Sequence, residues 1–211
     1  MATTKPALFI IGAGGHAKVV ADCAELLGYE SIAMVDDNFP AVTQCGRWPV
    51  IGQLDHLQKL DPSTAECFVA IGNNAVRARL CAQLLTQGWT LSTLIHPTAV
   101  IARDSQIGAG TLILANVVLN AFSSIGKGCI LNTACSVDHD CDIGDCVHIA
   151  PGARLAGSVR VGKETFIGIG SAVIQQITIG ERVTIGAGST VLKNIANDQL
   201  AVGSPAQIKQ K

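Results

Sequence analysis

Aromatic residues, charges and long apolar runs are all scarce in this chain of 211 residues. Aromatic side chains make up 4% and charged side chains 15% of the sequence, whereas soluble domains average about 25% charged residues. Because 48% of the residues are hydrophobic, the composition argues against a disordered chain. The formal net charge of −1 offers no basic field for nucleic acid or a membrane surface. No apolar run is as long as a transmembrane helix, and residues 1–6 lack a signal-peptide core, so we expect a cytoplasmic protein.

Eight cysteines are present, but their spacing fits neither a disulfide framework nor a metal site. No two of them are spaced as in CxxC, and three of them, Cys129, Cys135 and Cys141, follow one another at intervals of six residues. We interpret these three as core thiols of a repeat rather than as metal ligands or redox groups.

An uninterrupted repeat of six residues fills the second half of the chain. From Ile95 to Val191 every sixth residue is Ile, Leu or Val, which gives seventeen hexads over residues 95–196. The fifth place of each hexad is mostly small, as at Ser123 and Cys129. We expect both places to point inward, where large aliphatic side chains stack and small ones fill the remaining space.

A second period of eighteen residues lies on top of the first. It is carried by Gly108, Gly126, Gly144, Gly162 and Gly180. Eighteen residues are three hexads, so one coil should contain three short strands and three corners. A glycine at a fixed corner fits a positive φ or close stacking of the backbone. The sequence therefore predicts a parallel β-helix.

Alternating strand and helix patterns in the first half predict a small, Rossmann-like α/β unit. Apolar runs at 7–11, 31–35 and 67–71 indicate strands, and helical spacing indicates helices over about 19–27, 54–60 and 76–84. We expect three parts: an α/β domain over 1–94, the β-helix over 95–196 and a C-terminal tail over 197–211.

A glycine loop, Gly12-Ala13-Gly14-Gly15-His16, follows the first expected strand. With Asp36 twenty-two residues after Gly14 it resembles a dinucleotide fingerprint, but Ala17 stands where the third glycine would be. Backbone N–H groups at the start of a helix favour phosphate. We expect a phosphate or nucleotide contact here, with a structural turn and NAD as alternatives.

A cluster of histidine and aspartate lies in the repeat at residues 138–148. His139 and His148 fall at hexad places that point away from the core, and His139 stands between Asp138 and Asp140. A carboxylate that orients a histidine can make it a general base, while the alternative is a solvated acidic rim. A calcium loop and a zinc site, as in a metal-dependent lyase or hydratase, are disfavoured by the ligand spacing.

The whole chain resembles the bacterial hexapeptide-repeat sugar acetyltransferases of the sialic-acid and bacillosamine pathways. Six segments carry the resemblance, at residues 12–16, 35–37, 70–74, 130–133, 139–148 and 202–206. The resemblance implies that the β-helix is left-handed and follows a nucleotide-sugar-binding α/β domain. It also implies acetyl-CoA as co-substrate, no metal, and a homotrimer with active sites between subunits.

Site residues are also implied by the resemblance. His139 is expected to be the general base and Asp140 its support, where a close relative has Glu. Acetyl-CoA is expected at His148, Gly157, Ile169 and Ala187, with the Gly157 N–H on the acetyl carbonyl. The nucleotide sugar is expected at Gly14, Gly15, His16, Asp36, Asp37 and Asn132.

The expected activity is direct transfer of acetyl from acetyl-CoA to the 4-amino group of a UDP-linked amino-trideoxy sugar of the bacillosamine type. Alternatives with the same chemistry are O-acetylation of sialic acid and N-acetylation of a dTDP-linked amino sugar. A different class is a nucleotide-binding scaffold without catalysis. No nucleophilic cysteine is needed, so we expect a ternary complex and no acetyl-enzyme.

Overall fold

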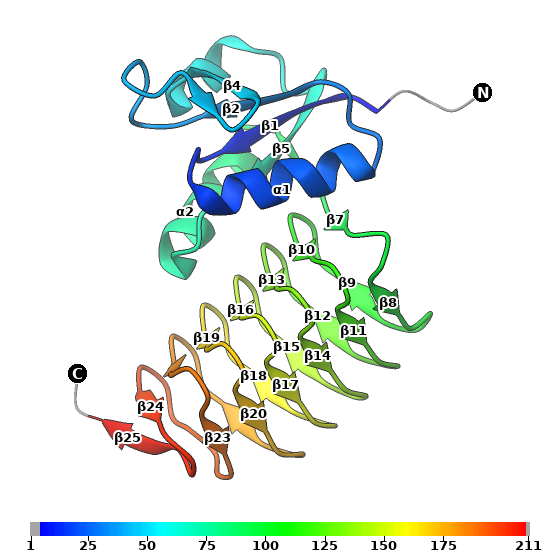
Figure 1. Cartoon of the computed structure of the whole chain (residues 1–211), viewed down its shortest axis with the longest axis vertical. Helices are drawn as coiled ribbons and strands as arrows, with labels where there is room; N and C mark the ends of the chain where they lie inside the picture. Colours follow the sequence, from blue (N-terminus) through cyan, green and yellow to red (C-terminus); the bar gives the residue numbers. More distant parts are fainter. Residues whose placement is uncertain (1–4, 210–211) are drawn as a thin grey trace. The chain divides into compact units, whose positions relative to one another are not determined.

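The computed structural model describes residues 5–209. Contacts within the chain divide it after Leu94 into two compact units, which are described separately (Figure 1). In the described residues, no helix combines the length and apolar character that crossing a membrane requires.

The first unit is a six-stranded sheet of order β3-β4-β2-β1-β5-β6, with two α-helices (Figure 1). The strands β1, β2, β4, β5 and β6 are parallel, and β3 pairs antiparallel with β4. The elements are β1 (Ala7–Ile11), α1 (Gly15–Leu26), β2 (Ile32–Val35), β3 (Gln44–Cys45), β4 (Trp48–Gly52), the 3-10 helix η1 (Leu54–Lys59), β5 (Ala65–Val69), α2 (Asn74–Thr86) and β6 (Thr90–Leu91).

Most expected elements of this unit are present, and three strands, β3, β4 and β6, were not expected. The strand expected at 67–71 is β5, which begins and ends two residues earlier. The hairpin of β3 and β4 was not expected, because Pro49 within β4 is typical of a strand break. Pro49 fits here because β4 meets the two-residue strand β3 at this position, opposite Gln44.

The second unit is a three-sided parallel β-helix, in which almost every strand has two residues (Figure 1). Face I holds β7 (Leu94–Ile95), β10 (Leu112–Ile113), β13 (Ile130–Leu131), β16 (His148–Ile149), β19 (Phe166–Ile167), β22 (Thr184–Ile185), β24 (Leu200–Val202) and β25 (Gln207–Lys209). Face II holds β8 (Val100–Ile101), β11 (Val118–Leu119), β14 (Ser136–Val137), β17 (Arg154–Leu155), β20 (Ala172–Val173) and β23 (Thr190–Val191). Face III holds β9 (Gln106–Ile107), β12 (Ser124–Ile125), β15 (Asp142–Ile143), β18 (Arg160–Val161) and β21 (Thr178–Ile179). We call the corners edge I/II, edge II/III and edge III/I after the faces that they join.

Both inward places of the hexad form the core, as predicted. Residues eighteen apart lie side by side, so Leu119 pairs with Val137 on face II. The fifth-place side chains also join the coils: Ser123 donates its hydroxyl to the Asp138 carbonyl at 2.7 Å, and the Cys141 N–H donates to the same hydroxyl oxygen at 3.1 Å. Cys129 occupies an equivalent place, and its thiol donates to the Gly144 carbonyl at 3.1 Å. A small hydrogen-bonding side chain therefore suits this place, whether serine, threonine or cysteine.

Each corner turns at the fourth residue of its hexad. From Gly110 to Gly188 this residue has positive φ in every hexad, whether it is glycine or a residue such as Asn116 or Phe122. The glycines with the period of eighteen have another role. A Cβ on Gly108 would lie 2.6 Å from the Gly126 carbonyl carbon, so close stacking, and not positive φ, requires glycine there.

The end of the β-helix differs from the expected seventeen full hexads and tail. Ile179 is bridged to Ile195 and Ile185 pairs with Ala201, so the last coil is sixteen residues long instead of eighteen. The segment expected as a tail contains β24, which continues face I, and β25, which pairs antiparallel with β24. Residues 210–211 of the expected tail lie outside the described residues.

Candidate functional site

His139 and Asp140 form an exposed pair on edge II/III, between β14 and β15. The Nδ1 atom of His139 lies 2.7 Å from Oδ2 of Asp140. Asp140 is the fourth residue of its hexad, with φ of 58°. The bond to Nδ1 directs Nε2 away from Asp140, so a proton can be accepted at Nε2.

A second carboxylate fixes the backbone of this pair. Asp138 accepts a hydrogen bond from the His139 N–H at 3.0 Å and another from the Asn120 side-chain amide at 2.8 Å. The hydrogen bond to Asp140 raises the pKa of His139 above its ordinary value of 6.5, and the negative charges of Asp138 and Asp140 add to this effect. The arrangement therefore makes His139 a stronger base than an isolated histidine.

Gly157 lies against the ring of His139, one coil further along the same edge. A Cβ at Gly157 would lie 2.6 Å from both Cε1 and Nε2 of His139. No described residue accepts a hydrogen bond from the Gly157 N–H. The structure thus brings together three of the predicted residues, His139, Asp140 and Gly157, with a backbone donor beside a base.

His148 and Asn132 form a second group on face I, where the coil turns toward edge I/II. The Asn132 side-chain nitrogen lies 3.2 Å from Nε2 of His148, and the His148 ring packs edge-to-face on Phe166 with a centroid distance of 5.1 Å. With the amide as donor, Nε2 is the acceptor and the ring proton is on Nδ1. Asn132 and Phe166 therefore fix the orientation and tautomer of His148.

Ile169 and Ala187 lie on edge I/II, one directly after the other in the stack. The Gly188 N–H donates to the Ile169 carbonyl at 2.8 Å, which places the two turns in adjacent coils. Ile169 is 56% exposed. Within one β-helix the expected acetyl-CoA residues are therefore divided: Gly157 lies on edge II/III, whereas Ile169 and Ala187 lie on edge I/II.

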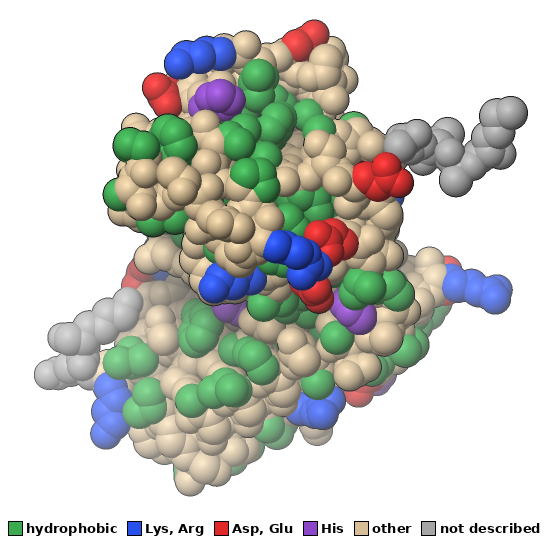
Figure 2. Space-filling model, turned by 45° about the horizontal axis from the view of Figure 1, so that its top comes forward, with side chains coloured by type: hydrophobic (Ala, Val, Ile, Leu, Met, Phe, Trp, Pro, Cys, Tyr) green, Lys and Arg blue, Asp and Glu red, His purple; other side chains and the backbone are tan. Residues whose placement is uncertain are grey.

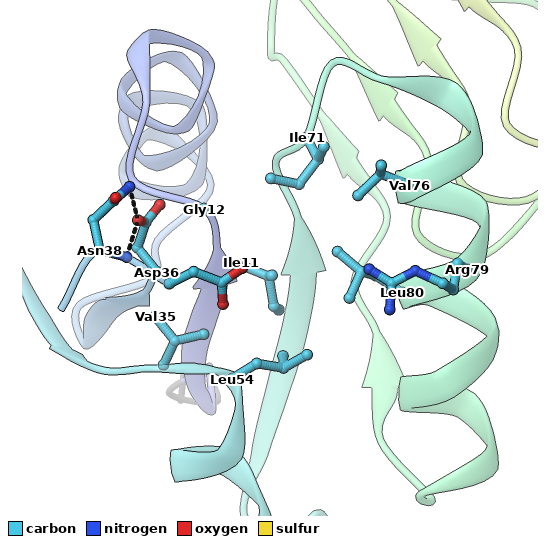
Figure 3. Close-up of a pocket in the computed structure, with 11 residues that line it drawn as sticks. Ile11, Gly12, Val35, Asp36, Asn38, Leu54, Ile71, Val76, Arg79 and Leu80 are labelled. Carbon is cyan, nitrogen blue, oxygen red and sulfur yellow. Dashed lines mark hydrogen bonds between the residues drawn. The ribbon is translucent and has the colours of Figure 1, made fainter.

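The first unit contains a pocket of about 360 Å³ at the carboxyl ends of β1, β2 and β5 (Figure 3). Asp36 and Asp37 line it, as expected for a ligand site of a parallel sheet. The pocket is also lined by Ile11, Gly12, Val35, Asn38, Leu54, Ile71, Val76, Arg79 and Leu80. Figure 3 shows Val76, Arg79 and Leu80 projecting from α2 toward it.

Asp36 ties the glycine loop to the second strand. Its carboxylate accepts hydrogen bonds from the backbone N–H groups of Ala13 and Asn38, at 2.8 and 2.9 Å, and from the Asn38 side chain at 2.8 Å. Partial burial alone would raise the pKa of Asp36, but these hydrogen bonds from Asn38 and Ala13 lower it. Asp36 is thus a charged acceptor that holds the loop in place.

Gly14, Gly15 and His16 do not line this pocket but form the start of α1, with Gly14 as the N-cap. Both glycines have open space where a Cβ would stand, so a ligand can approach the backbone. Burial lowers the pKa of His16, and the positive charge of Arg77 lowers it further. Backbone N–H groups at the start of a helix suit an anionic or polar ligand.

Sequence reasoning missed Arg79, Leu54 and Val76 as pocket residues. They come from α2, which follows β5, and from η1, which follows β4, whereas the glycine loop follows β1. Arg79 could have been found from the sequence. Its helix follows a parallel strand and so begins at the carboxyl end of the sheet, where ligands of such sheets bind.

Cys129, Cys135 and Cys141 lie in the core of the β-helix, as predicted. All eight cysteines are buried, and burial raises the pKa of Cys67 and Cys135 to about 12. Within residues 5–209, no group of three or more His, Cys, Asp or Glu side chains is placed to hold a metal ion. On the face seen in Figure 2, the charged side chains of the described residues are dispersed and form no continuous basic patch.

Two families of known domains match the chain. The PglD N-terminal domain matches residues 7–84, and the bacterial transferase hexapeptide (six repeats) matches residues 158–193. The chain is 37% identical over 109 residues to the UDP-N-acetylbacillosamine N-acetyltransferase of Bacillus subtilis (strain 168), a match that covers 50% of each protein. The chain spans about half the length of the curated relatives that it matches.

Solved structures match over almost the whole chain. A perosamine N-acetyltransferase variant from Caulobacter crescentus, in complex with CoA and GDP-perosamine, has 39% identity and a TM-score of 0.92, covering 97% of both chains. The acetyltransferase domain of PglB from Neisseria gonorrhoeae FA1090, in complex with acetyl coenzyme A, has 39% identity and a TM-score of 0.94, covering 97% of this chain and 100% of that one. These matches confirm the predicted fold, a Rossmann-like α/β domain followed by a left-handed β-helix. The chain belongs to the family of bacterial hexapeptide-repeat acetyltransferases that contains these sugar N-acetyltransferases.

Proposed function

We propose that the protein transfers acetyl from acetyl-CoA to the 4-amino group of a nucleotide-linked deoxyamino sugar, with His139 as general base. The observation that carries this proposal is the cluster on edge II/III, where Asp140 holds Nδ1 of His139 and Gly157 presents a backbone N–H beside the ring. The solved relatives bind CoA with GDP-perosamine, or acetyl-CoA, which supports both substrate classes.

The proposed reaction is a single displacement. The amine nitrogen bonds to the acetyl carbonyl carbon while its proton moves to Nε2 of His139. The carbon–sulfur bond then breaks, and CoA leaves as a thiolate that takes a proton from the imidazolium. The Gly157 N–H stabilises the oxyanion that forms between these events. The buried cysteines take no part, so acetyl does not become attached to the protein.

Asp36, Asp37 and the start of α1 would bind the nucleotide. The first unit supplies two acidic side chains, the guanidinium of Arg79 and the exposed N–H groups at Gly14 and Gly15, which together suit a base, a ribose and a diphosphate. Our first candidate is a UDP-linked sugar. A GDP-linked sugar is the second candidate, since the perosamine enzyme matches this chain over 97% of its length.

The division of the site between two edges supports a trimer with shared active sites. Face II is the face that lies between edge I/II and edge II/III, and it carries the exposed apolar side chains Val100, Ile174 and Leu192. A threefold axis beside face II would place His139 of one subunit against edge I/II of the next. His148, Ile169 and Ala187 of that neighbour would then complete the acetyl-CoA site.

The test is release of CoA thiol with UDP-, GDP- and dTDP-linked 4-amino sugars and with sialic acid, each compared with the His139→Ala variant. We expect turnover of one nucleotide amino sugar and its loss in the variant. Turnover of sialic acid alone would favour O-acetylation. Tight nucleotide binding without thiol release from any acceptor, and without acetyl-CoA binding, would favour a scaffold.

A further inference from the structure

Phe122 is a bulky side chain in a conformation and an environment that both disfavour it. It is 67% exposed, and its φ is 61°. A left-handed backbone is strained for most residues with a Cβ, and glycine or asparagine avoids most of that strain. Nothing in the packing of the described β-helix core uses Phe122, because the core contains the first and fifth places of each hexad.

The position of Phe122 relates it to the proposed base. It lies eighteen residues before Asp140, and the Asp140 N–H donates to the Ala121 carbonyl at 3.1 Å. The register of β12 with β15 and of β11 with β14 places the corner of Phe122 directly beside the corner of His139. Phe122 is therefore the fourth-place residue of the coil next to the His139–Asp140 pair.

The residues proposed for acetyl-CoA all follow His139 in the stack of coils. His148 and Gly157 lie within one coil of it, and Ile169 and Ala187, on edge I/II, lie further toward the C-terminal end. In the proposed reaction the acceptor amine therefore reaches Nε2 from the side of the coil before His139. That coil carries Ala121 and Phe122 at its corner, and Phe122 is the largest side chain of this corner.

We infer that Phe122 forms an apolar wall for the acceptor sugar and selects a sugar with a methyl group at C6 over one with a hydroxymethyl group. This inference rests on the proposed function. An exposed phenyl ring gains contact area from a methyl group, whereas a hydroxyl against the ring would lose hydrogen bonds to water. Positive φ is common to the fourth places of the stack, so the exposure of the phenyl ring beside the His139 corner carries the inference.

The experiment compares two acceptors that differ only at C6: a nucleotide-linked 4-amino-4,6-dideoxyhexose and the matching 4-amino-4-deoxyhexose. The nucleotide is the one that the wild-type protein uses. We expect the wild type to favour the 6-deoxy sugar by about tenfold in kcat/KM. In Phe122→Asn this ratio should fall to near one, mainly through a lower kcat/KM for the 6-deoxy sugar, while the KM for acetyl-CoA stays unchanged.

Glu164→Asn is the matched control. Glu164 is also a fourth-place residue, with φ of 59°, but it lies on edge III/I. Both variants should melt no lower than the wild type, because asparagine tolerates positive φ. Glu164→Asn should keep the tenfold preference.

Three results would overturn the inference. An unchanged C6 preference in Phe122→Asn would exclude Phe122 as the selecting residue. A Phe122→Asn protein that no longer assembles like the wild type would show that the ring belongs to a subunit contact. A wild type that releases no CoA with either sugar would overturn the proposed function together with the inference.

Discussion

Gly157 connects the backbone of one coil to the proposed base of the coil before it. An added Cβ would overlap the His139 ring at 2.6 Å, so Gly157→Ala must displace the imidazole from Asp140 or shift the edge. Because a misplacement of about 1 Å can cost about a hundredfold in rate, we expect kcat/KM to fall by roughly that factor while the fold stays intact. Steady-state kinetics and circular dichroism would measure the two effects.

A double-mutant cycle with His139→Ala separates this effect from others. Once the ring is absent, Gly157→Ala should cause little further loss. If Gly157→Ala reduces activity equally in both backgrounds, its effect does not pass through His139.

The pH dependence of the reaction should follow His139. The hydrogen bond that His139 donates to Asp140 and the charge of Asp138 raise the pKa of His139 above 6.5, so the imidazole is protonated and inactive as a base over a wider acidic range. The acidic limb of kcat/KM should therefore have its midpoint above 6.5 in the wild type. In Asp140→Asn the midpoint should move to lower pH, and the plateau at high pH should also fall, because the ring is less basic and less well oriented. A midpoint that does not move would show that Asp140 is not coupled to the group that titrates.

The buried thiols predict a simple chemical behaviour. All eight cysteines lie in the described residues and are buried. In the native state we expect almost no reaction with a thiol reagent such as dithionitrobenzoate, and we expect eight thiols to react in denaturant. Rapid labelling of one thiol in the native protein would contradict this expectation.

At the level of the elements, the column of glycines at the start of edge III/I allows the coils to stack closely. A Cβ on Gly162 would lie 2.5 Å from the Glu181 backbone nitrogen, which cannot move without separating two coils. We expect Gly162→Ala to cost about 1–3 kcal/mol and to lower the melting temperature. The control is Gly72→Ala, because open space surrounds the position of its Cβ. Equal melting temperatures for the two variants would contradict this account.

The elements that could be predicted are those whose sequence repeats or forms an apolar run. The inward place of the hexad recurs from Ile95 onward, so the strands of the β-helix followed from a period alone. The positive φ at the fourth place could not be predicted from the sequence. Residues as different as Phe122 and Glu164 occupy this place, and the stack imposes the turn. The hairpin of β3 and β4 was missed because Pro49 outweighed the neighbouring apolar residues.

The sequence indicated candidate site residues but not their arrangement. Residues eighteen apart share an edge, which already places Gly157 beside His139 and Ala187 beside Ile169. His139 and Ile169 are thirty residues apart, which is not a multiple of eighteen. The sequence spacing alone therefore indicates that they lie on different edges. The pocket in the first unit depends on Arg79 and Leu54. The order of strands and helices indicated the end of the sheet, but which side chains of α2 and η1 line the pocket is a tertiary property.

For the whole molecule, shared active sites predict that two inactive variants can rescue each other. His139→Ala damages edge II/III, and Ala187→Trp would obstruct edge I/II. Each variant alone should be inactive, but a trimer mixed from both contains intact pairs of edges at some interfaces. We expect co-expressed subunits to regain up to about a third of the wild-type activity, measured by thiol release.

The control for this experiment mixes two variants of one edge, His139→Ala and Gly157→Ala. These should not rescue each other, because every interface would carry a damaged edge II/III. No activity in the first mixture would show that the site lies within one subunit. Activity in the second mixture would show that His139 and Gly157 of one site come from different subunits.

The offset of eighteen residues between stacked strands also governs how the chain can change in length. Removing or adding eighteen residues moves every later strand to the place of its neighbour on the same face, so inward side chains stay inward. A change of any other length would rotate faces out of register, except at the end, where a coil of sixteen residues is accommodated. The β-helix can therefore grow or shrink only in whole steps of about 4.8 Å. Such a step after Gly157 would alter the length of edge available to the arm of CoA in the proposed complex, while His139 and Gly157 stay in place.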